Sequence, residues 1–371
     1  MATTGDTEAR IGDVARAAGV STTTVSRVLN GRAAAIRISA ATVERVRHAA
    51  EHLHYHPNAS ALSLRTAKTR TIGVVARDLL TPWAAQLLRT VYAVCESRGY
   101  YLLLSHAEHS RGKGRELSSI LRSDRVDGVL FIGDMLGLAE AQGWGELDGR
   151  VQLHRHVVSV GTRPSVAGGL SVTIDFAYGT CLALEHLMTL GHRVIGYIGP
   201  RTGHEAWESQ QRFCAYRQFL DAHGLPRDPA NEVIFLPSVN AAQVVLRDML
   251  MRPQGPSAVF VENDSLAILV LRAALTCGVR VPADLSIVGF DDIPFAALSA
   301  PSLTTVHYPI EEIARCAATG LLDRIEGKSP SGEMAETDPT VLFVPTLISR
   351  ESTGPVLTAQ RGSVVRLANS Y

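Results

Sequence analysis

The sequence predicts a small all-α unit followed by a larger α/β body that contains two parallel sheets. Three observations lead to this prediction. Two short helical patterns near the amino terminus are separated by one glycine, and positive charge is concentrated around them. From residue 71 onwards, apolar strand-like runs alternate with amphipathic helical stretches. A chain of 371 residues is also too long for one small core, so two or three domains are expected.

Charge is unevenly distributed along the chain, although the formal net charge is zero. Residues 1–70 carry ten Lys and Arg against five Asp and Glu, whereas the remaining residues carry 26 basic and 31 acidic side chains. A small basic unit on a larger acidic body indicates that the basic unit, and not the body, binds a polyanion.

The first two helical patterns fit a helix-turn-helix. A helix is expected over residues 11–18, and Gly19 ends it because glycine adopts tight turn conformations easily. Ser21 is placed to cap a second helix, which Asn30-Gly31 ends. The two helices are expected to pack through apolar residues at helical spacing: Val14, Ala15, Ala18, Val25, Val28 and Leu29.

A third helix is expected over residues 40–53, with Ser39 as its cap. Its apolar residues keep the spacing of a buried stripe: Val43, Val46, Ala50 and Leu53. The three helices together would form a small domain over residues 10–56, after a disordered tail over residues 1–9.

The polar face of the second helix is the candidate DNA-binding surface. Thr22, Thr23, Ser26 and Arg27 lie where a recognition helix enters the major groove. Hydroxyl groups can bind base edges or phosphates, and arginine can bind guanine through two hydrogen bonds. The alternative is an ordinary solvent-exposed face of a small helical domain.

Two segments carry a resemblance to a known family. "IGDVARAAGVSTTTVSRVLNG" (residues 11–31) and "YHPNASALSLRTAKTRTIGVV" (residues 55–75) occur in the order found in the lac repressor (LacI/GalR) family of bacterial transcriptional regulators. The similarity continues to about residue 353. The resemblance implies a head that binds operator DNA through residues in and around the second helix: Ser21, Thr22, Thr23, Ser26, Arg27 and Asn30.

Residues 57–70 are expected to be a hinge and linker. Taken alone, "NASALSLRT" is too short to form a stable helix and fits a flexible linker equally well. The resemblance implies that it folds on operator DNA and pairs with the hinge of a dimer mate. Leu64 would then wedge into a minor-groove base step, with Ala61 against the groove floor and Asn58 at the DNA.

Three histidines on one helical track raise the question of a metal site. His48, His52 and His56 are spaced four apart. A solvated or phosphate-facing helix is the preferred interpretation, because no cysteine or carboxylate cluster completes a ligand set. The five cysteines are scattered and have no CxxC spacing, which is typical of reduced thiols in a cytosolic protein.

The body is expected to span residues 71–355 and to contain two doubly wound units. Ligands bind at the carboxyl ends of the strands in such sheets, so two facing units create a cleft. The arrangement resembles the periplasmic-binding-protein-like sensor that the family uses. The resemblance implies three crossings between subdomains, near residues 166, 298 and 329. Subdomain 1 would hold about 71–166 and 299–329, and subdomain 2 about 167–298 and 330–355; a C-terminal tail, 356–371, follows.

The resemblance also assigns effector-binding residues in the cleft. Asp291 in "VGFDD" would bind ligand hydroxyls, Arg212 would reach the ligand, and Trp83 would stack on a sugar face. Asn263 would contact the ligand and also cap the helix that it begins. Asp175 is the fifth residue that the resemblance assigns to effector binding. Without the resemblance, Arg212 could be a surface charge, and Trp207, a weaker pocket candidate, fits core packing as well.

Two other classes of protein are disfavoured by what the sequence lacks. A solute-binding protein would carry a signal peptide, and the first residues show no basic segment followed by an apolar one. The sequence contains no run of 18 apolar residues, so a membrane span is not expected. An enzyme would need catalytic motifs, and no P-loop, GxSxG or HExxH is present. No cofactor is predicted.

The sequence therefore predicts a cytoplasmic transcriptional repressor that binds a palindromic operator as a homodimer. A small-molecule effector in the cleft, a sugar or sugar derivative, would control it. The alternative is an activator or dual regulator of the same family that responds to a non-sugar metabolite. The tail after Arg350 shows no leucine heptads, so a dimer is expected and not a tetramer.

Overall fold

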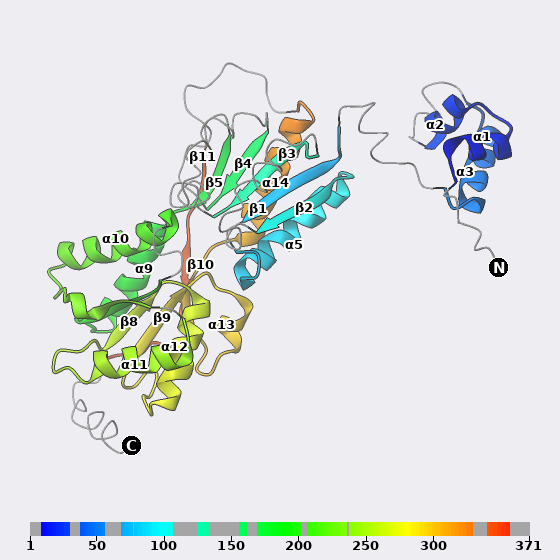
Figure 1. Ribbon diagram of the computed structural model, residues 1–371. Helices are drawn as coiled ribbons and strands as arrows, with labels where there is room; N and C mark the ends of the chain where they lie inside the picture. The colour runs from blue at the N-terminus through cyan, green and yellow to red at the C-terminus, as the bar shows by residue number, and fades with distance from the viewer. Residues whose placement is uncertain are drawn as a thin grey trace, which may run out of the picture. The chain divides into compact units, whose positions relative to one another are not determined.

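The computed structural model divides the chain into two compact units, residues 1–69 and 70–371, and each is described by itself (Figure 1). The structure describes residues 9–29, 38–55, 68–76, 78–106, 125–133, 156–161, 169–201, 206–235, 237–328 and 340–356.

The described part of the first unit contains three helices, α1 (Ile11–Ala18), α2 (Thr22–Leu29) and α3 (Ala40–His52). The predicted helices are confirmed, and the third ends one residue early because Leu53 is its C-cap. Each helix contributes to one small core, whose buried members are Val14, Ala15, Ala18, Val25, Val28, Val46, Ala49 and Ala50. Val43 and Leu53 pack against this core and are only partly buried.

The predicted cap residues are confirmed as well. Gly19 has a φ of 65°, a left-handed conformation that favours glycine, and it closes α1. The hydroxyl of Ser21 accepts a hydrogen bond from the backbone nitrogen of Thr24 at 3.1 Å. Ser39 accepts one from the backbone nitrogen of Thr42 at 3.3 Å. The turn between α1 and α2 is thereby specified by local hydrogen bonds.

The second unit, the body, contains two six-stranded sheets (Figure 1). The first sheet has the order β11-β5-β4-β3-β1-β2, and every neighbouring pair is parallel. We call this sheet, with helices α5 (Pro82–Ser97) and α14 (Ile310–Ile325), lobe A. Its strands are β1 (Thr71–Ala76), β2 (Tyr101–His106), β3 (Gly128–Ile132), β4 (Val157–Val160), β5 (Leu170–Ile174) and β11 (Thr340–Phe343).

The second sheet has the order β12-β10-β9-β8-β6-β7, in which only β12 runs antiparallel to its neighbour. We call this sheet and its helices lobe B. Its strands are β6 (Ile195–Pro200), β7 (Glu232–Phe235), β8 (Ala258–Val261), β9 (Ser286–Phe290), β10 (Thr304–His307) and β12 (Thr346–Ile348). Its helices are α9 (Phe176–Thr189), α10 (Trp207–Ala222), η2 (Pro229–Asn231), α11 (Val239–Leu250), α12 (Asp264–Thr276) and α13 (Pro294–Leu298).

The chain passes between the two sheets later than predicted. The passages lie between β5 and α9, between β10 and α14, and between β11 and β12, at residues 174–176, 307–310 and 343–346. The predicted crossings near 166, 298 and 329 are therefore wrong in position. Strands β5 and β11 pair with each other in lobe A, and β10 pairs with β9 in lobe B before the chain leaves.

Apolar side chains from both lobes form one continuous buried core. It includes Ile72 and Leu130 from lobe A together with Tyr197, Phe260 and Phe290 from lobe B. A second cluster lies within lobe B between its sheet and helices α11 and α12. Within the described part of the chain, no helix has the length and apolar character needed to span a membrane.

Candidate functional site: a recognition helix and an interlobe cavity

Helix α2 presents the polar face that the sequence predicts. Ser21, Thr22, Thr23 and Arg27 are exposed, and Ser26 is half-buried. The opposite face of the helix packs inward through Val25 and Val28. The Ser21 hydroxyl is engaged in the cap and also lies 2.9 Å from the hydroxyl of Thr24. Four further predicted DNA contacts, Asn30, Asn58, Ala61 and Leu64, lie outside the described residues.

The histidine track on α3 is only partly described. The rings of His48 and His52 stack with their centroids 6.4 Å apart, and His56 lies outside the described residues. Within the described ranges, no group of three His, Cys, Asp or Glu side chains is placed to hold a metal ion.

A cavity of about 320 Å³ lies between lobes A and B. As predicted, the residues that line it follow the carboxyl ends of strands, such as Gly133 after β3, Asn263 after β8 and Asp291 after β9. Four of the five predicted effector residues line this cavity: Trp83, Arg212, Asn263 and Asp291.

Asp175 is the predicted effector residue that is not among the described lining residues of the cavity. Its carboxylate accepts a hydrogen bond from the backbone nitrogen of Tyr178 at 2.9 Å and so caps α9. Capping holds this side chain against its own helix, which the motif could not reveal. Trp207 is likewise used in packing, with its ring edge-on to Phe176 at a centroid distance of 5.9 Å.

Arg212 is a buried cation that lines the cavity, and it is only 6% exposed. Its guanidinium carbon lies 5.0 Å from the ring centre of Phe176 and 5.0 Å from that of Phe290. A guanidinium nitrogen lies 3.6 Å from Oε1 of Glu262, an ion pair too long for a hydrogen bond. Its buried Nε has no hydrogen-bond acceptor among the described residues. This Nε has almost no accessible surface, so it is a buried donor and is not open to the cavity.

Electrostatics keep this buried guanidinium charged. Burial lowers the pKa of Arg212, but the carboxylates of Glu262, Asp291 and Glu208 outweigh that effect and raise the pKa overall. The neighbouring rings of Phe176 and Phe290 add a cation–π attraction. The guanidinium of Arg212 is therefore a permanent positive charge, and its neighbours hold it in place.

Glu262 lines the cavity and contacts three other side chains there, and the sequence analysis did not predict it. It is 2% exposed and accepts hydrogen bonds from the hydroxyls of Tyr197 at 2.7 Å and Ser209 at 2.5 Å. Its position at the carboxyl end of β8, directly before Asn263, is the sequence feature that could have identified Glu262 as a site residue. Phe176, Glu208 and Tyr308 also line the cavity and were not predicted.

Asp291 lies at the end of β9 in an unusual backbone conformation. Its φ is 111° and that of Asp292 is 49°, values that residues with a side chain rarely adopt. The hydroxyl of Tyr308 donates a hydrogen bond to Oδ1 of Asp291 at 2.8 Å. Burial raises the pKa of Asp291 to about 6, although Arg212 and the Tyr308 hydrogen bond act in the opposite direction.

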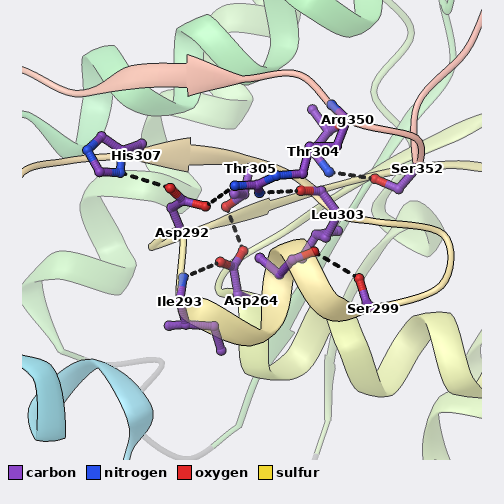
Figure 2. A network of polar contacts seen from close by, with 11 residues as sticks. Asp264, Asp292, Ile293, Ser299, Leu303, Thr304, Thr305, His307, Arg350 and Ser352 are labelled. Carbon is purple, nitrogen blue, oxygen red and sulfur yellow. Dashed lines mark hydrogen bonds and ion pairs between the residues drawn. The ribbon is translucent and has the colours of Figure 1, made fainter.

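A polar network around Asp264 and Asp292 holds the chain directly after Asp291 (Figure 2). Asp264 accepts hydrogen bonds from the hydroxyl of Thr305 at 2.6 Å and from the backbone nitrogen of Ile293 at 2.9 Å. Asp292 pairs with His307 at 2.9 Å and Arg350 at 2.6 Å. The two residues that follow the strained Asp291 are thereby fixed.

Asn263 and Trp83 sit at helix starts that face the cavity. The side chain of Asn263 accepts a hydrogen bond from the backbone nitrogen of Leu266 at 2.9 Å, which confirms the predicted cap of α12. Trp83 lies in the first turn of α5, which Thr81 caps. Its buried indole Nε1 has no hydrogen-bond acceptor among the described residues. Trp83 in lobe A and Arg212 in lobe B thus both line the cavity.

Comparisons with known proteins agree with this arrangement. The model for bacterial regulatory proteins of the lacI family matches residues 10–58, and the model for periplasmic binding protein-like domains matches residues 184–353. The HTH-type transcriptional regulator DegA of Bacillus subtilis (strain 168) is 31% identical over 349 residues, which cover 93% of this chain and 98% of DegA.

Two solved structures extend the similarity. A crystal structure of the lac repressor dimer bound to operator and the anti-inducer ONPF covers 94% of this chain and 100% of its own, with a TM-score of 0.77 and 24% identity. A complex of the transcriptional regulator CelR with cellobiose covers 93% of this chain and 99% of its own, with a TM-score of 0.63 and 28% identity. The chain therefore belongs to the lacI family of bacterial regulatory proteins, as a DNA-binding transcriptional regulator and not an enzyme.

Proposed function

We propose that this protein is a cytoplasmic repressor that binds a palindromic operator as a homodimer and is controlled by a carbohydrate effector in the interlobe cavity. The observation that carries the proposal is the buried guanidinium of Arg212, which lies at the wall of the cavity against the rings of Phe176 and Phe290. A regulator with such a cavity has two separate sites, which is the requirement for allosteric control.

Helix α2 is the proposed reader of the operator. Its exposed hydroxyls and Arg27 can reach base edges in the major groove while Val25 and Val28 anchor the helix in its own core. For the hinge, we propose that Leu64 unstacks a minor-groove base step next to Ala61 and Asn58, so that specific binding depends on DNA deformation.

The chemistry of the cavity fits a polyhydroxy compound. Carboxylates and Asn263 can accept hydrogen bonds from hydroxyl groups, and the guanidinium of Arg212 can donate to them. The indole ring of Trp83 adds an apolar face of the kind on which sugar rings stack. The cellobiose bound by the similar regulator CelR supports a carbohydrate.

Coupling between cavity and DNA is proposed to run through the three passages between the lobes. Phe176 and Tyr308 line the cavity and also belong to two of these passages. If a guest binds one arrangement of the two lobes more tightly than another, it increases the fraction of molecules in that arrangement. Only a difference in affinity between the two arrangements can move this equilibrium. Lobe A begins directly after the hinge, so its orientation would be transmitted to the DNA-binding unit.

Exposed apolar side chains on the body support a dimer. On lobe A they are Tyr92 on α5 and Tyr101 and Leu104 on the edge strand β2. On lobe B they include Val244 on α11 and Leu275 on α12. Large exposed apolar side chains are among the residues that a partner subunit commonly covers. The dimer seen for the structurally similar lac repressor is consistent with this proposal.

The decisive experiment identifies the operator and then measures its affinity with and without candidate metabolites. Genome fragments protected by the purified full chain define the operator. The proposal expects a palindrome, and Arg27→Ala should weaken binding at least about tenfold, as one lost bidentate base contact would. A metabolite that strengthens operator binding would identify a co-repressor, and activation of the adjacent promoter would favour the activator alternative. If no small molecule changes operator affinity, effector control is wrong.

A further inference from the structure

Glu262 is a buried carboxylate whose two oxygens are held by different elements of lobe B. Its Oε2 accepts the hydrogen bond from Tyr197 on β6, and its Oε1 accepts the one from Ser209 on α10. A Cβ at Gly199, also on β6, would lie 2.9 Å from this Oε2, so the glycine leaves the space that the carboxylate occupies. Two hydrogen bonds to one charged acceptor fix its orientation.

Tyr197 holds this carboxylate from the interior of lobe B. The tyrosine is completely buried, and its ring contacts three other aromatic rings. The centroid distances are 4.8 Å to Phe213, 5.3 Å to Tyr216 and 5.9 Å to Phe260. Close packing restricts the ring, so its hydroxyl is a donor with a fixed position behind Glu262.

The oxygen of Glu262 that binds Ser209 also faces the guanidinium of Arg212. Oε1 lies 3.6 Å from a guanidinium nitrogen, and Ser209 lies three residues before Arg212 on α10. Residues three apart lie on the same side of a helix, which is why one oxygen can meet both side chains. Burial lowers the pKa of Arg212, and among the carboxylates that raise it Glu262 has the largest effect.

The other neighbours of the guanidinium do not set its direction in the same way. The rings of Phe176 and Phe290 attract a cation to their faces, and this attraction depends weakly on how the cation is turned. An arginine side chain also loses much rotamer freedom when it is held in one place. A carboxylate of fixed orientation can supply the direction that the rings do not.

We propose that Glu262 is a positioning residue of the effector site, which holds the guanidinium of Arg212 at the cavity wall so that it meets a guest in one geometry. This inference rests on the proposed effector control and deepens it. A donor that is already in place loses less freedom on binding, so a guest binds it more tightly. Neutralising Glu262 therefore weakens effector binding through Arg212 and leaves the DNA-binding unit unchanged.

Methylguanidinium, a free copy of the arginine head group, tests this position without any effector. Arg212→Ala vacates the place of the head group, and a compound that binds the folded state raises Tm. Millimolar methylguanidinium chloride should raise the Tm of Arg212→Ala, with methylammonium chloride as the control for ionic strength. The double variant Arg212→Ala/Glu262→Gln should need at least about ten times more for the same rise, because its charged partner is gone.

A purely structural role gives a different result in this experiment. If Glu262 only supported the fold, Glu262→Gln would lower Tm but would not change the concentration of methylguanidinium that is required. The same concentration dependence in both variants would therefore overturn the inference, as would the absence of any rise in Arg212→Ala.

Hydrogen exchange at Nε of Arg212 measures the same position in a chain that keeps the arginine. With isotope-labelled arginine, the Nε–H resonance is assigned by its absence in Arg212→Lys. This buried group should exchange slowly in the wild type, and at least about ten times faster in Glu262→Gln, because a side chain that is released opens to water. Tyr197→Phe, which removes only the hydroxyl behind the carboxylate, should cause a smaller increase.

Glu232→Gln is the matched control for both measurements. Glu232 on β7 pairs with Arg217 at 2.5 Å, so the pair also joins an arginine of α10 to a carboxylate on a strand. Neither residue is among the described residues that line the cavity. The exchange rate at Arg212 should keep its wild-type value in this variant. An unchanged rate in Glu262→Gln would show that Glu262 does not position the arginine.

Operator titrations with a bacterial metabolite extract separate the two proposals. Glu262→Gln should need about ten times more extract than the wild type for half of the change in operator affinity, with the same affinity in its absence. If the extract has no effect on the wild type while exchange at Arg212 responds to Glu262→Gln, effector control is wrong and the positioning of Arg212 stands. If the extract acts equally on both proteins, effector control stands and the role of Glu262 in it is wrong.

Discussion

The hydroxyl of Tyr308 donates a hydrogen bond of 2.8 Å to Oδ1 of Asp291, and this bond joins a passage between the lobes to the wall of the cavity. Tyr308 lies between β10 and α14, where the chain leaves lobe B for lobe A, and Asp291 ends β9 in lobe B. Both side chains line the cavity. A guest that engages Asp291 therefore acts on a residue bonded to a point about which the lobes can rearrange.

Tyr308→Phe is expected to reduce the change in operator affinity that the effector causes. Its effect on the stability of the fold is expected to be smaller. The variant removes the hydrogen bond that lowers the pKa of Asp291, so this pKa should rise above its value of about 6. At pH 6.5 a larger fraction of Asp291 would then be protonated than in the wild type. Titrations of operator binding with effector at pH 6.5 and pH 8 should show a loss that is greater at pH 6.5. An equal loss at both pH values would contradict this assignment.

Arg212→Ala and Asp291→Asn should abolish the response to effector and leave operator binding intact. Both residues line the cavity, and neither belongs to the DNA-binding unit. The loss of a buried polar partner costs about 1–3 kcal/mol of binding, which is the size of a typical allosteric coupling. DNA-binding titrations with and without effector test this. A variant that also loses operator binding would show that the residue is needed for the fold.

Stability of the body is expected to decline as pH rises, in part because of Asp264. Burial raises the pKa of Asp264 to about 8 from the ordinary 3.8. Between these values the folded state binds the proton more tightly than the unfolded state, so the free energy of unfolding falls with rising pH. Asp264→Asn has no such proton to lose. Its amide can donate to the hydroxyl of Thr305 and still accept from the backbone nitrogen of Ile293.

Urea unfolding of the wild type and Asp264→Asn at pH 5 and pH 8 measures this effect. Relative to the wild type, the variant should gain at least about 1 kcal/mol between pH 5 and pH 8, because one unit of pKa shift is worth about 1.4 kcal/mol. The same difference between wild type and variant at both pH values would mean that Asp264 is ionised throughout.

The hinge is expected to be unfolded alone and helical on operator. "NASALSLRT" is too short to form a stable helix in water, and the predicted wedge Leu64 needs a base step to enter. Amide hydrogen exchange should show protection at residues 59–64 only in the presence of operator. Leu64→Ala should weaken specific binding and spare most nonspecific binding, since the latter comes from phosphate contacts. Equal losses of both would exclude the wedge.

The protein is expected to be a dimer in solution. The sequence after Arg350 has no leucine heptads that could join two dimers. Exposed apolar side chains on α5 and β2 of lobe A, and on α11 and α12 of lobe B, are available for one partner. Sedimentation at micromolar concentration should therefore give twice the mass of the chain, 39.9 kDa. Replacing Tyr101 and Leu104 with Ser should produce monomers, and a stable tetramer would contradict the prediction.

The sequence by itself determined the local features of this protein. The helices of the DNA-binding unit and their caps Ser21 and Ser39 follow from hydrogen bonds and apolar spacing between residues close in the chain. Similarly, Asn263 was predicted as a helix cap because the cap belongs to its own helix. Arg212, Trp83 and Asp291 were placed at the cavity by the resemblance of the segments that contain them to the family.

Tertiary structure alone decided which of these groups meet and what each one does. Glu262 gains Tyr197 and Ser209 as partners from different elements, and only folding brings them together. The side chain of Asp175 caps its own helix, whereas the next residue, Phe176, lines the cavity. The passages between the lobes lie later than predicted because short strands such as β10 and β11 are defined by pairing with distant strands, and no local pattern records that pairing.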